Sequence, residues 1–311
     1  MNAISDQPAR RRRATKAAMK REMPAPVASP PAPMPGLFGP LNPPFADWQG
    51  RRVWVIGASY GLGAAIAREL LDRGAVVALS ARNGDLLKSV AGAHREAMIL
   101  PLDVTDPDSA QRAAAAIDQA WGGLDLALLV AGTHVEMRAR LPRTVAGRDP
   151  GAKPPYWDLA RARQLLEVNL HGVLNCVDAV LPILLRQQGG GIAIFSSVAG
   201  YVGLPRSLIY GASKAALINF AEALYGDLRP QGVGVYLVNP GFVDTPLTRK
   251  NDFAMPALMK AEDAARATLD GIAAGEFEIH YPKRFTSWLK LLRILPYRLQ
   301  FAAVRRATRD V

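Results

Sequence analysis

Tyr210 and Lys214 stand four residues apart in the run Tyr210-Gly-Ala-Ser-Lys214. The apolar residues that follow predict a helix, on which positions i and i+4 share one face. A free phenol titrates near pH ~10, and a cation held beside it favours the phenolate and lowers that pKa. A tyrosine and a lysine on one helical face can therefore act as a general acid/base pair. The alternative is a packed tyrosine beside a solvated lysine, neither with a catalytic role. Other motifs in the chain are needed to choose between the two interpretations.

A glycine-rich turn lies where a predicted strand, residues 52–56, passes into a predicted helix, residues 64–71. Glycines let the backbone turn tightly and let a phosphate approach the helix N-terminus, where amide groups and the helix dipole attract it. In this strand–turn–helix setting the turn predicts a dinucleotide site. The predicted contacts are Gly57, Ser59, Tyr60, Gly61, Leu62 and Gly63.

The second predicted strand, residues 75–80, should end beside the ribose of such a dinucleotide. NAD-binding folds usually carry an acidic residue there, but this strand is followed by Ala81 and Arg82, with no carboxylate before Asp85. An arginine suits a 2′-phosphate, which it binds through paired hydrogen bonds. The sequence therefore favours NADP(H) over NAD(H), and the alternative for Arg82 is an ordinary surface arginine.

Strands and helices alternate along the remaining chain. Further strands are predicted at residues 97–100, 124–130, 191–197, 232–239 and 277–281, and helices at 107–121, at 159–188 and around Tyr210. This alternation predicts an α/β fold with one parallel sheet of about seven strands, and ligands at the carboxyl ends of the strands. Pro182 should kink or end the helix at 159–188. Residues 133–158 are expected to form a loop or flap near the site.

The composition bears on whether the protein has disulfides, a metal site or a membrane-spanning helix. The 311 residues include one cysteine, Cys176, which excludes an intramolecular disulfide and fits a reducing compartment. Its apolar neighbours predict a buried structural thiol. The four histidines lack ligand spacing, so no metal site is expected. The sequence shows no run of ~18 apolar residues and no secretory signal, which predicts a cytoplasmic protein without a transmembrane helix.

The formal net charge of +11 is concentrated at the two ends of the chain. Residues 1–48 are basic and then rich in proline, which predicts a disordered tail. This tail is either solvated or a tether to anionic lipid or nucleic acid. Nucleic-acid binding ranks last, because no aromatic and basic recognition surface accompanies the arginines.

Residues 283–311 form a basic amphipathic segment after the predicted catalytic domain, residues 49–282. In this segment Trp288, Leu291, Leu292 and Leu295 recur at helical spacing between cations. The pattern fits a membrane interface, which would make a lipid-like carbonyl or alcohol a natural substrate, and it fits equally a helix packed on the domain or on a second subunit. Peripheral contact with a membrane surface therefore stays open beside a purely cytoplasmic location.

Taken together, residues 50–282 resemble a classical short-chain dehydrogenase/reductase, a family with a Rossmann-type, doubly wound parallel sheet. Ser197 precedes Tyr210 by thirteen residues and Asn169 precedes it by forty-one, as in that family. The chain departs from the family pattern at Ile56, at Val130 and in the long connection 133–168. The matching motifs are Gly57-x-x-x-Gly61-x-Gly63, Asp103, Ala131-Gly132, Asn169, Ser197, Tyr210-x-x-x-Lys214 and Pro240-Gly241.

The resemblance implies four catalytic residues. Tyr210 would exchange a proton with the substrate oxygen, and Ser197 would hydrogen-bond that oxygen. Lys214 would lower the pKa of Tyr210 and bind the nicotinamide ribose, while Asn169 would hold a water linking Lys214 to solvent. The implied cofactor contacts beyond the glycine turn and Arg82 are Asp103, which would contact the adenine, together with Val104, Ala131, Gly132, Tyr210, Lys214, Pro240, Gly241, Val243 and Thr245.

The predicted function is therefore an NAD(P)H-dependent oxidoreductase that interconverts a carbonyl and a secondary alcohol on a small-molecule or lipid-like substrate. The alternative is a non-catalytic NADP-binding regulator or scaffold. The resemblance further implies a homo-oligomer, assembled through helices such as 159–188 and 209–228.

Overall fold

The fold is seen in a computed structural model that describes residues 39–45, 47–137, 139, 158–250 and 255–308. The first 38 residues of the predicted N-terminal tail lie outside the described residues. So does most of the predicted flap, at residues 138 and 140–157.

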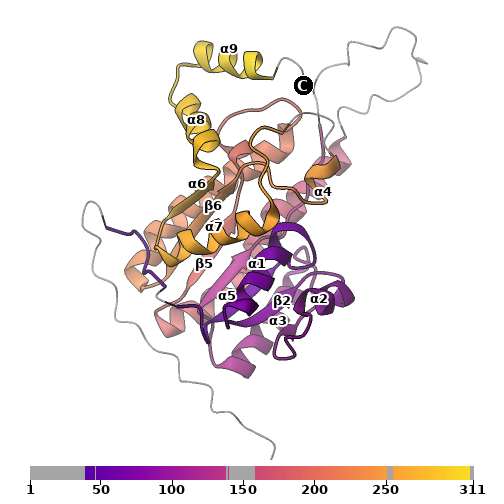
Figure 1. Cartoon of the computed structure of the whole chain (residues 1–311), viewed down its shortest axis with the longest axis vertical. Coiled ribbons are helices and arrows are strands. Elements are labelled where there is room, and N and C mark those ends of the chain that lie inside the picture. The colour runs from indigo at the N-terminus through magenta and orange to yellow at the C-terminus, as the bar shows by residue number, and fades with distance from the viewer. Residues whose placement is uncertain (1–38, 46, 138, 140–157, 251–254, 309–311) are drawn as a thin grey trace, which may run out of the picture.

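Seven parallel strands form one sheet in the order β3-β2-β1-β4-β5-β6-β7 (Figure 1). This confirms the predicted α/β class and the predicted strand number. Because β1 and β4 are neighbours, the strand order reverses between them, and ligands of such sheets bind outside the carboxyl ends at that point. The strands are β1 Arg52–Ile56, β2 Val76–Ser80, β3 Met98–Ile99, β4 Leu126–Leu129, β5 Gly191–Phe195, β6 Gly234–Pro240 and β7 Glu278–Tyr281.

Helices cover both faces of the sheet (Figure 1). One face packs against α1 (Gly61–Asp72), α2 (Gly84–Ala91) and α7 (Ala261–Ala273), whose buried residues share a core with alternate residues of the strands. The other face packs against α3 (Pro107–Trp121), α5 (Gly172–Gln187) and α6 (Leu208–Leu228). Because these strands are buried on both faces, their sequences are nearly continuous apolar runs.

The long helical pattern at 159–188 divides into α4 (Leu159–Leu166), a π-helical turn (Glu167–His171) and α5. Pro182 does not end it, because α5 continues to Gln187. The stretch 159–187 is long enough to cross a membrane, and its most apolar 18-residue window has a mean hydropathy of 1.6. Half of that window is buried inside the protein, where α5 packs against α3 and the sheet as a core helix does. Cys176 lies in that core, and burial raises the pKa of its thiol to about 12, as expected for a structural thiol.

The packed chain begins before the predicted boundary at residue 49. The Asn42 side chain exchanges two hydrogen bonds with the backbone of Val235, at 2.7 and 2.9 Å. Trp48 is buried and its ring stacks on that of Phe45. The last part of the predicted disordered tail is therefore a strap that packs against the start of β6.

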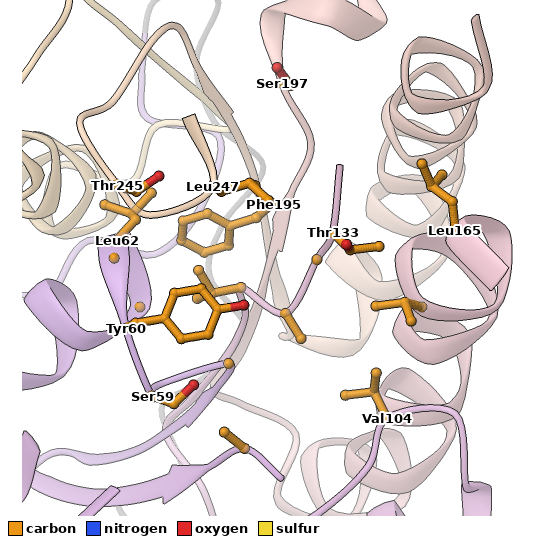
Figure 2. Close-up of a pocket in the computed structure, with 18 of the residues that line it drawn as sticks. Ser59, Tyr60, Leu62, Val104, Thr133, Leu165, Phe195, Ser197, Thr245 and Leu247 are labelled. Carbon is orange, nitrogen blue, oxygen red and sulfur yellow. The ribbon is translucent and has the colours of Figure 1, made fainter. Parts of the chain in front are cut away.

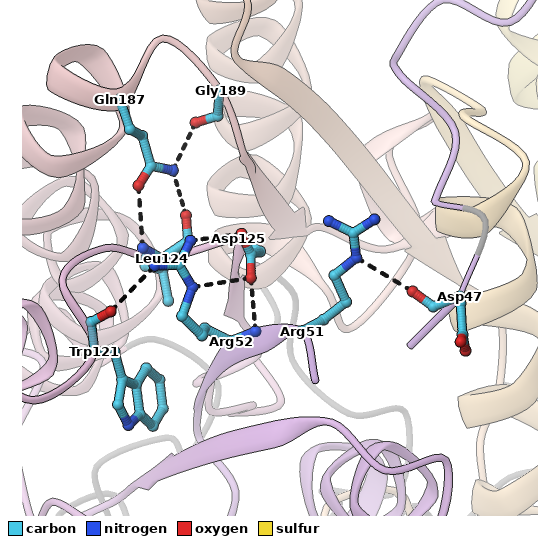
Figure 3. Close-up of polar contacts among 8 residues, drawn as sticks. All are labelled: Asp47, Arg51, Arg52, Trp121, Leu124, Asp125, Gln187 and Gly189. Carbon is cyan, nitrogen blue, oxygen red and sulfur yellow. Dashed lines mark hydrogen bonds and ion pairs between the residues drawn. The ribbon is translucent and has the colours of Figure 1, made fainter. Parts of the chain in front are cut away.

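An ion pair between a buried arginine and a partly buried aspartate joins β1 to the start of β4 at the amino end of the sheet. The guanidinium of Arg52 donates to both carboxylate oxygens of Asp125, at 2.8 and 3.1 Å, and to the carbonyl of Trp121 at 3.2 Å (Figure 3). The side chain of Gln187 pairs with the backbone of Leu124 beside it. These contacts fix the end of the sheet that lies opposite the predicted site.

We expect Asp125→Asn to lower the free energy of unfolding by about 3 kcal/mol, because it leaves the buried Arg52 guanidinium without its counter-charge. Urea denaturation followed by circular dichroism measures this change. The control is Asp118→Asn, which removes the half-exposed ion pair with Arg186 and should cost no more than about 1 kcal/mol. Equal losses in the two variants would contradict a special role for the buried pair.

The C-terminal segment forms two helices, α8 (Lys283–Arg293) and α9 (Tyr297–Ala307). In α8 Leu289 and Leu292 are buried against the domain, whereas Trp288 and Leu291 are exposed. Of the four residues at helical spacing, Leu292 is therefore buried, whereas Trp288 and Leu291 face outward. One side of α8 packs on the domain, and the other side faces outward.

Candidate active site

A cavity of about 530 Å³ opens at the carboxyl ends of the strands (Figure 2). Its volume lies within the range of ligand pockets, roughly 300–1,000 Å³. With the exception of Asn169, every predicted catalytic and cofactor-binding residue lines it, from Gly57 in the first turn to Thr245 after β6. Residues far apart in the sequence meet here because the carboxyl ends of parallel strands share one edge of the sheet.

The glycine turn forms one wall of the cavity. Gly57 has a φ of 98°, and a Cβ on it would lie 2.5 Å from the backbone nitrogen of Ala131. A Cβ on Gly63 would lie 2.2 Å from the carbonyl oxygen of Gly57. Tyr60, the N-cap of α1, makes no side-chain hydrogen bond to the first turn, whereas α3 is capped by the carboxylate of Asp106. The N-terminus of α1 thus offers its first amide groups to an anion in the cavity.

A cation, Arg82, and a carboxylate, Asp103, line the part of the cavity next to the ends of β2 and β3. Arg82 is exposed just after β2. The carboxylate of Asp103 accepts hydrogen bonds from the backbone amide of Thr105 at 3.0 Å and from its hydroxyl at 2.8 Å. The bond from the Thr105 amide is the main cause that holds the pKa of Asp103 below its ordinary value; burial opposes it, and the charge of Arg82 adds to it. An acceptor and a cation are therefore available to the same ligand.

Ser197, Tyr210 and Lys214 lie together on the wall formed by β5 and α6. The buried ammonium of Lys214 donates to the carbonyl of Phe195 at 2.8 Å and lies 5.8 Å from the centre of the Tyr210 ring. Burial lowers the pKa of Lys214 to about 8. The hydroxyl of Ser197, two residues after the end of β5, accepts from the amide of Ala199 at 3.2 Å. The predicted cluster of hydroxyl, phenol and amine is thus present in the fold.

The pKa of Tyr210 is raised in the fold, whereas the sequence predicted that Lys214 would lower it. Burial raises the pKa of the phenol, and its hydrogen bond with Ser197 only partly opposes this. The reason is that Tyr210 sits half-buried in the cavity wall, where the surrounding protein disfavours the charged phenolate, while the lysine nitrogen lies over the ring and bonds to a backbone carbonyl. At neutral pH Tyr210 is therefore a protonated phenol, the form that can donate a proton.

Asn169 lies behind the cavity wall, not in it. Its side chain is buried in the π-helical turn between α4 and α5. The amide oxygen accepts from the backbone nitrogen of Thr133 at 2.7 Å, and the amide nitrogen donates to the carbonyl of Thr133 at 2.9 Å. Asn169 thus fixes the chain just after Gly132, next to Lys214. π-helical turns frequently occur at functional sites.

The sequence did not single out several residues of this site. His134 packs edge-on against the ring of Tyr210, with ring centres 4.8 Å apart. Burial lowers the pKa of His134, and the charge of Glu136 opposes that shift, so the imidazole is neutral at pH 7. The only sequence signal was its place in the long connection after Ala131-Gly132. His134 itself does not line the cavity, but further unanticipated residues do, among them Thr133, Val135, Leu165, Val168 and Leu247.

Comparison with known proteins decides the family. The profile of the short chain dehydrogenase family matches residues 51–255, which covers most of the described sheet and both walls of the cavity. The chain belongs to the short-chain dehydrogenase family. An uncharacterized oxidoreductase of Myxococcus xanthus is 34% identical over 265 residues, covering 84% of this chain and 99% of that relative. A second one, from Staphylococcus epidermidis, is 31% identical over 216 residues, covering 69% and 87%.

Solved structures of short-chain dehydrogenases share the fold. One from Burkholderia cenocepacia, in complex with NADP, is 28% identical with a TM-score of 0.67, covering 83% of this chain and 98% of that one. One from Burkholderia phymatum, in complex with NAD, has a TM-score of 0.68 and covers 79% and 93%. At 24% identity the second likeness concerns the fold alone. This short-chain dehydrogenase is accordingly an oxidoreductase, as the sequence predicted.

Proposed function

We propose that this short-chain dehydrogenase interconverts a carbonyl and a secondary alcohol, with NADP(H) as cofactor and Tyr210 as the general acid/base. One observation carries the proposal: Ser197, Tyr210 and Lys214 line the same cavity as the glycine turn and Arg82. A hydride donor and a proton donor can therefore act on one substrate within a single cavity.

The cavity residues fit a nicotinamide dinucleotide. The uncapped N-terminus of α1 suits a pyrophosphate, because its amide groups and dipole attract anions. Asp103 and Val104 border the part of the cavity that would take the adenine, and Pro240, Gly241, Val243 and Thr245 border the part beside Tyr210. When bound there, the nicotinamide supplies or accepts the hydride, and the protein supplies the proton, the orientation and the charge.

Each catalytic side chain has a separate task. In carbonyl reduction the protonated phenol of Tyr210 gives its proton to the substrate oxygen, which becomes the hydroxyl of the alcohol. Ser197 hydrogen-bonds the same oxygen and orients it. Lys214 stabilises the phenolate that remains, and Asn169 acts through Thr133 by positioning the chain beside the lysine. In the oxidation direction the phenolate takes the proton from the alcohol.

The preference for NADP(H) depends on Arg82. We expect Arg82→Gln to lower kcat/KM for NADPH about tenfold to a hundredfold, because the charged hydrogen bonds to the 2′-phosphate are lost. With NADH, which lacks that phosphate, kcat/KM should change by no more than about twofold. Steady-state kinetics with both cofactors measures this, and Arg68→Gln on the exposed side of α1 is the matched control. An equal effect on both cofactors would contradict the assignment.

The substrate we propose is apolar and lipid-like. Val135, Leu165, Val168 and Leu247 line the cavity beyond the cofactor-binding residues. A methylene buried against such walls contributes about 0.8 kcal/mol, so each one added should raise kcat/KM about fourfold until the cavity is filled. A series of straight-chain methyl ketones, assayed by NADPH consumption, tests this. A flat series, or a preference for charged ketones, would contradict an apolar substrate.

The alternative, a regulator that binds NADP without catalysis, makes a different prediction. It would bind NADPH, as seen by its fluorescence, yet turn over no ketone or alcohol of a broad panel. Turnover of any panel member that disappears in Tyr210→Phe excludes this alternative.

A further inference from the structure

The C-terminal helices carry an exposed apolar surface that the proposed reaction does not use. Of the fourteen exposed large hydrophobic side chains in the described part of the chain, six lie within residues 288–301. Ile294 and Tyr297, 77% and 74% exposed, flank the bend between α8 and α9. Such crowding marks a binding surface, whereas single exposed apolar residues do not. The six are Trp288, Leu291, Ile294, Tyr297, Leu299 and Phe301.

This surface is displayed by helices that are anchored to the domain. The ammonium of Lys290 in α8 lies 2.5 Å from the carboxylate of Glu278 in β7, and the hydroxyl of Tyr201 donates to the same carboxylate. In α9 the side-chain amide of Gln300 donates to the carbonyl of Leu292 at 3.1 Å, and Val304 is buried. The outward face is therefore a fixed feature of the fold, and its exposure does not come from fraying of the chain end.

The charge around the surface has one sign. Residues 283–308 contain seven lysines and arginines and no aspartate or glutamate. Lys283 and Lys290 pair with carboxylates of the domain, Glu276 and Glu278. The remaining five cations are exposed and stand next to the apolar residues in the sequence. They are Arg284, Arg293, Arg298, Arg305 and Arg306.

This exposed face could be covered by a second copy of the chain or by a lipid bilayer, and its charge favours the bilayer. A second copy of the chain, packed through a two-fold interface, would bring the same five arginines of each subunit together. A surface that is both negatively charged and able to accept apolar side chains avoids this repulsion. We propose that α8 and α9 dock the protein on a bilayer containing anionic lipid, with the exposed apolar side chains of α8 and the stacked Tyr297 and Phe301 of α9 at the headgroup level and the arginines against the phosphates.

Docking in this way would turn the cavity edge of the sheet toward the bilayer. The helix α8 begins two residues after β7 ends, at the carboxyl edge that also carries the cavity. Phe285 in α8 packs against Phe242, with ring centres 5.9 Å apart, and Phe242 follows the cavity-lining Gly241. Figure 1 shows α8 and α9 at one end of the molecule, with α9 standing away from the sheet.

Co-sedimentation of the full chain with vesicles tests the proposal. The vesicles contain phosphatidylcholine alone or an equimolar mixture with phosphatidylglycerol. We expect binding to the mixed vesicles at low salt and at least about tenfold weaker binding to the neutral ones. Ile294→Ser with Phe301→Ser should weaken binding to the mixed vesicles at least about tenfold. Arg298→Gln with Arg305→Gln should weaken it about thirtyfold and reduce its salt dependence.

Matched double variants elsewhere on the surface serve as controls. Leu174→Ser with Leu185→Ser removes two exposed leucines of α5, and Arg68→Gln with Arg95→Gln removes two exposed arginines. Both should bind like the unaltered protein. The basic N-terminal residues are present in every variant, so differences between variants report on α8 and α9. Circular dichroism and thermal unfolding confirm that each variant is folded.

Three results would overturn the proposal. The first is no sedimentation with mixed vesicles at low salt. The second is equal binding by the α8–α9 variants and the controls. The third is a smaller particle mass of Ile294→Ser with Phe301→Ser in analytical ultracentrifugation without any change in vesicle binding, which would assign the surface to a second copy. None of these readouts depends on the reaction proposed above.

Discussion

Tyr210→Phe should lower the turnover number for carbonyl reduction at least about a thousandfold, because it removes only the hydroxyl that gives its proton to the substrate oxygen. The phenyl ring keeps the packing against His134 and Lys214. The dissociation constant for NADPH should therefore stay within about threefold of the unaltered value, which separates loss of the proton donor from loss of cofactor binding. Stopped-flow turnover and fluorescence titration measure the two quantities.

Tyr225→Phe is the matched control for this experiment. Tyr225 lies on the same helix, and its hydroxyl donates to the carbonyl of Leu41 outside the cavity. Its removal should leave turnover within about twofold, since a hydrogen bond at the surface contributes little to the transition state. If Tyr210→Phe and Tyr225→Phe retained equal activity, Tyr210 would not be the acid.

Lys214→Met should lower kcat/KM for reduction about a hundredfold or more, because the phenolate left after proton transfer loses the nearby cation. The lysine also gives the reaction a pH dependence. Its pKa is lowered to about 8 by burial, so the ammonium is charged below that pH and neutral above it. The reduction rate of the unaltered enzyme should therefore fall as the pH rises through about 8.

Lys214→Arg distinguishes charge from structure at this position. A guanidinium keeps its proton throughout the accessible range, so the residual activity of this variant should show no fall near pH 8. The kcat/KM profile between pH 6 and 10, taken with NADPH saturating, provides the comparison. The same alkaline fall in Lys214→Arg would assign that titration to another group.

Most of the fold could be predicted from short-range patterns in the sequence. The bounds of α3 are those predicted, because Asp106 caps its start, Pro107 occupies its first turn and Gly122 follows it in the left-handed conformation. The strands were placed to within one or two residues at each end, since apolar runs bounded by turns are short-range patterns. The parallel arrangement then placed Gly57, Ser197 and Pro240 at one edge of the sheet.

What the sequence did not predict depends on contacts between distant residues. The bonds of Asn169 to Thr133 span 36 residues, and those of Asn42 to Val235 span 193. In neither pair do the residues next to it in the sequence indicate the distant partner. In α8 the periodicity allowed either side to be buried, and only the position of the domain decides that Leu289 faces inward and Trp288 outward. The raised pKa of Tyr210 likewise follows from burial, which is a property of the fold.

Transfer of deuterium from NADPH labelled at the reactive carbon of its nicotinamide tests the central claim most directly. An apolar methyl ketone is incubated with the labelled cofactor and the protein, and the product is examined by mass spectrometry. The account predicts one deuterium on the carbinol carbon of the alcohol with the unaltered protein and essentially none with Tyr210→Phe. Unlabelled alcohol, or equal labelling by Tyr210→Phe, would contradict it.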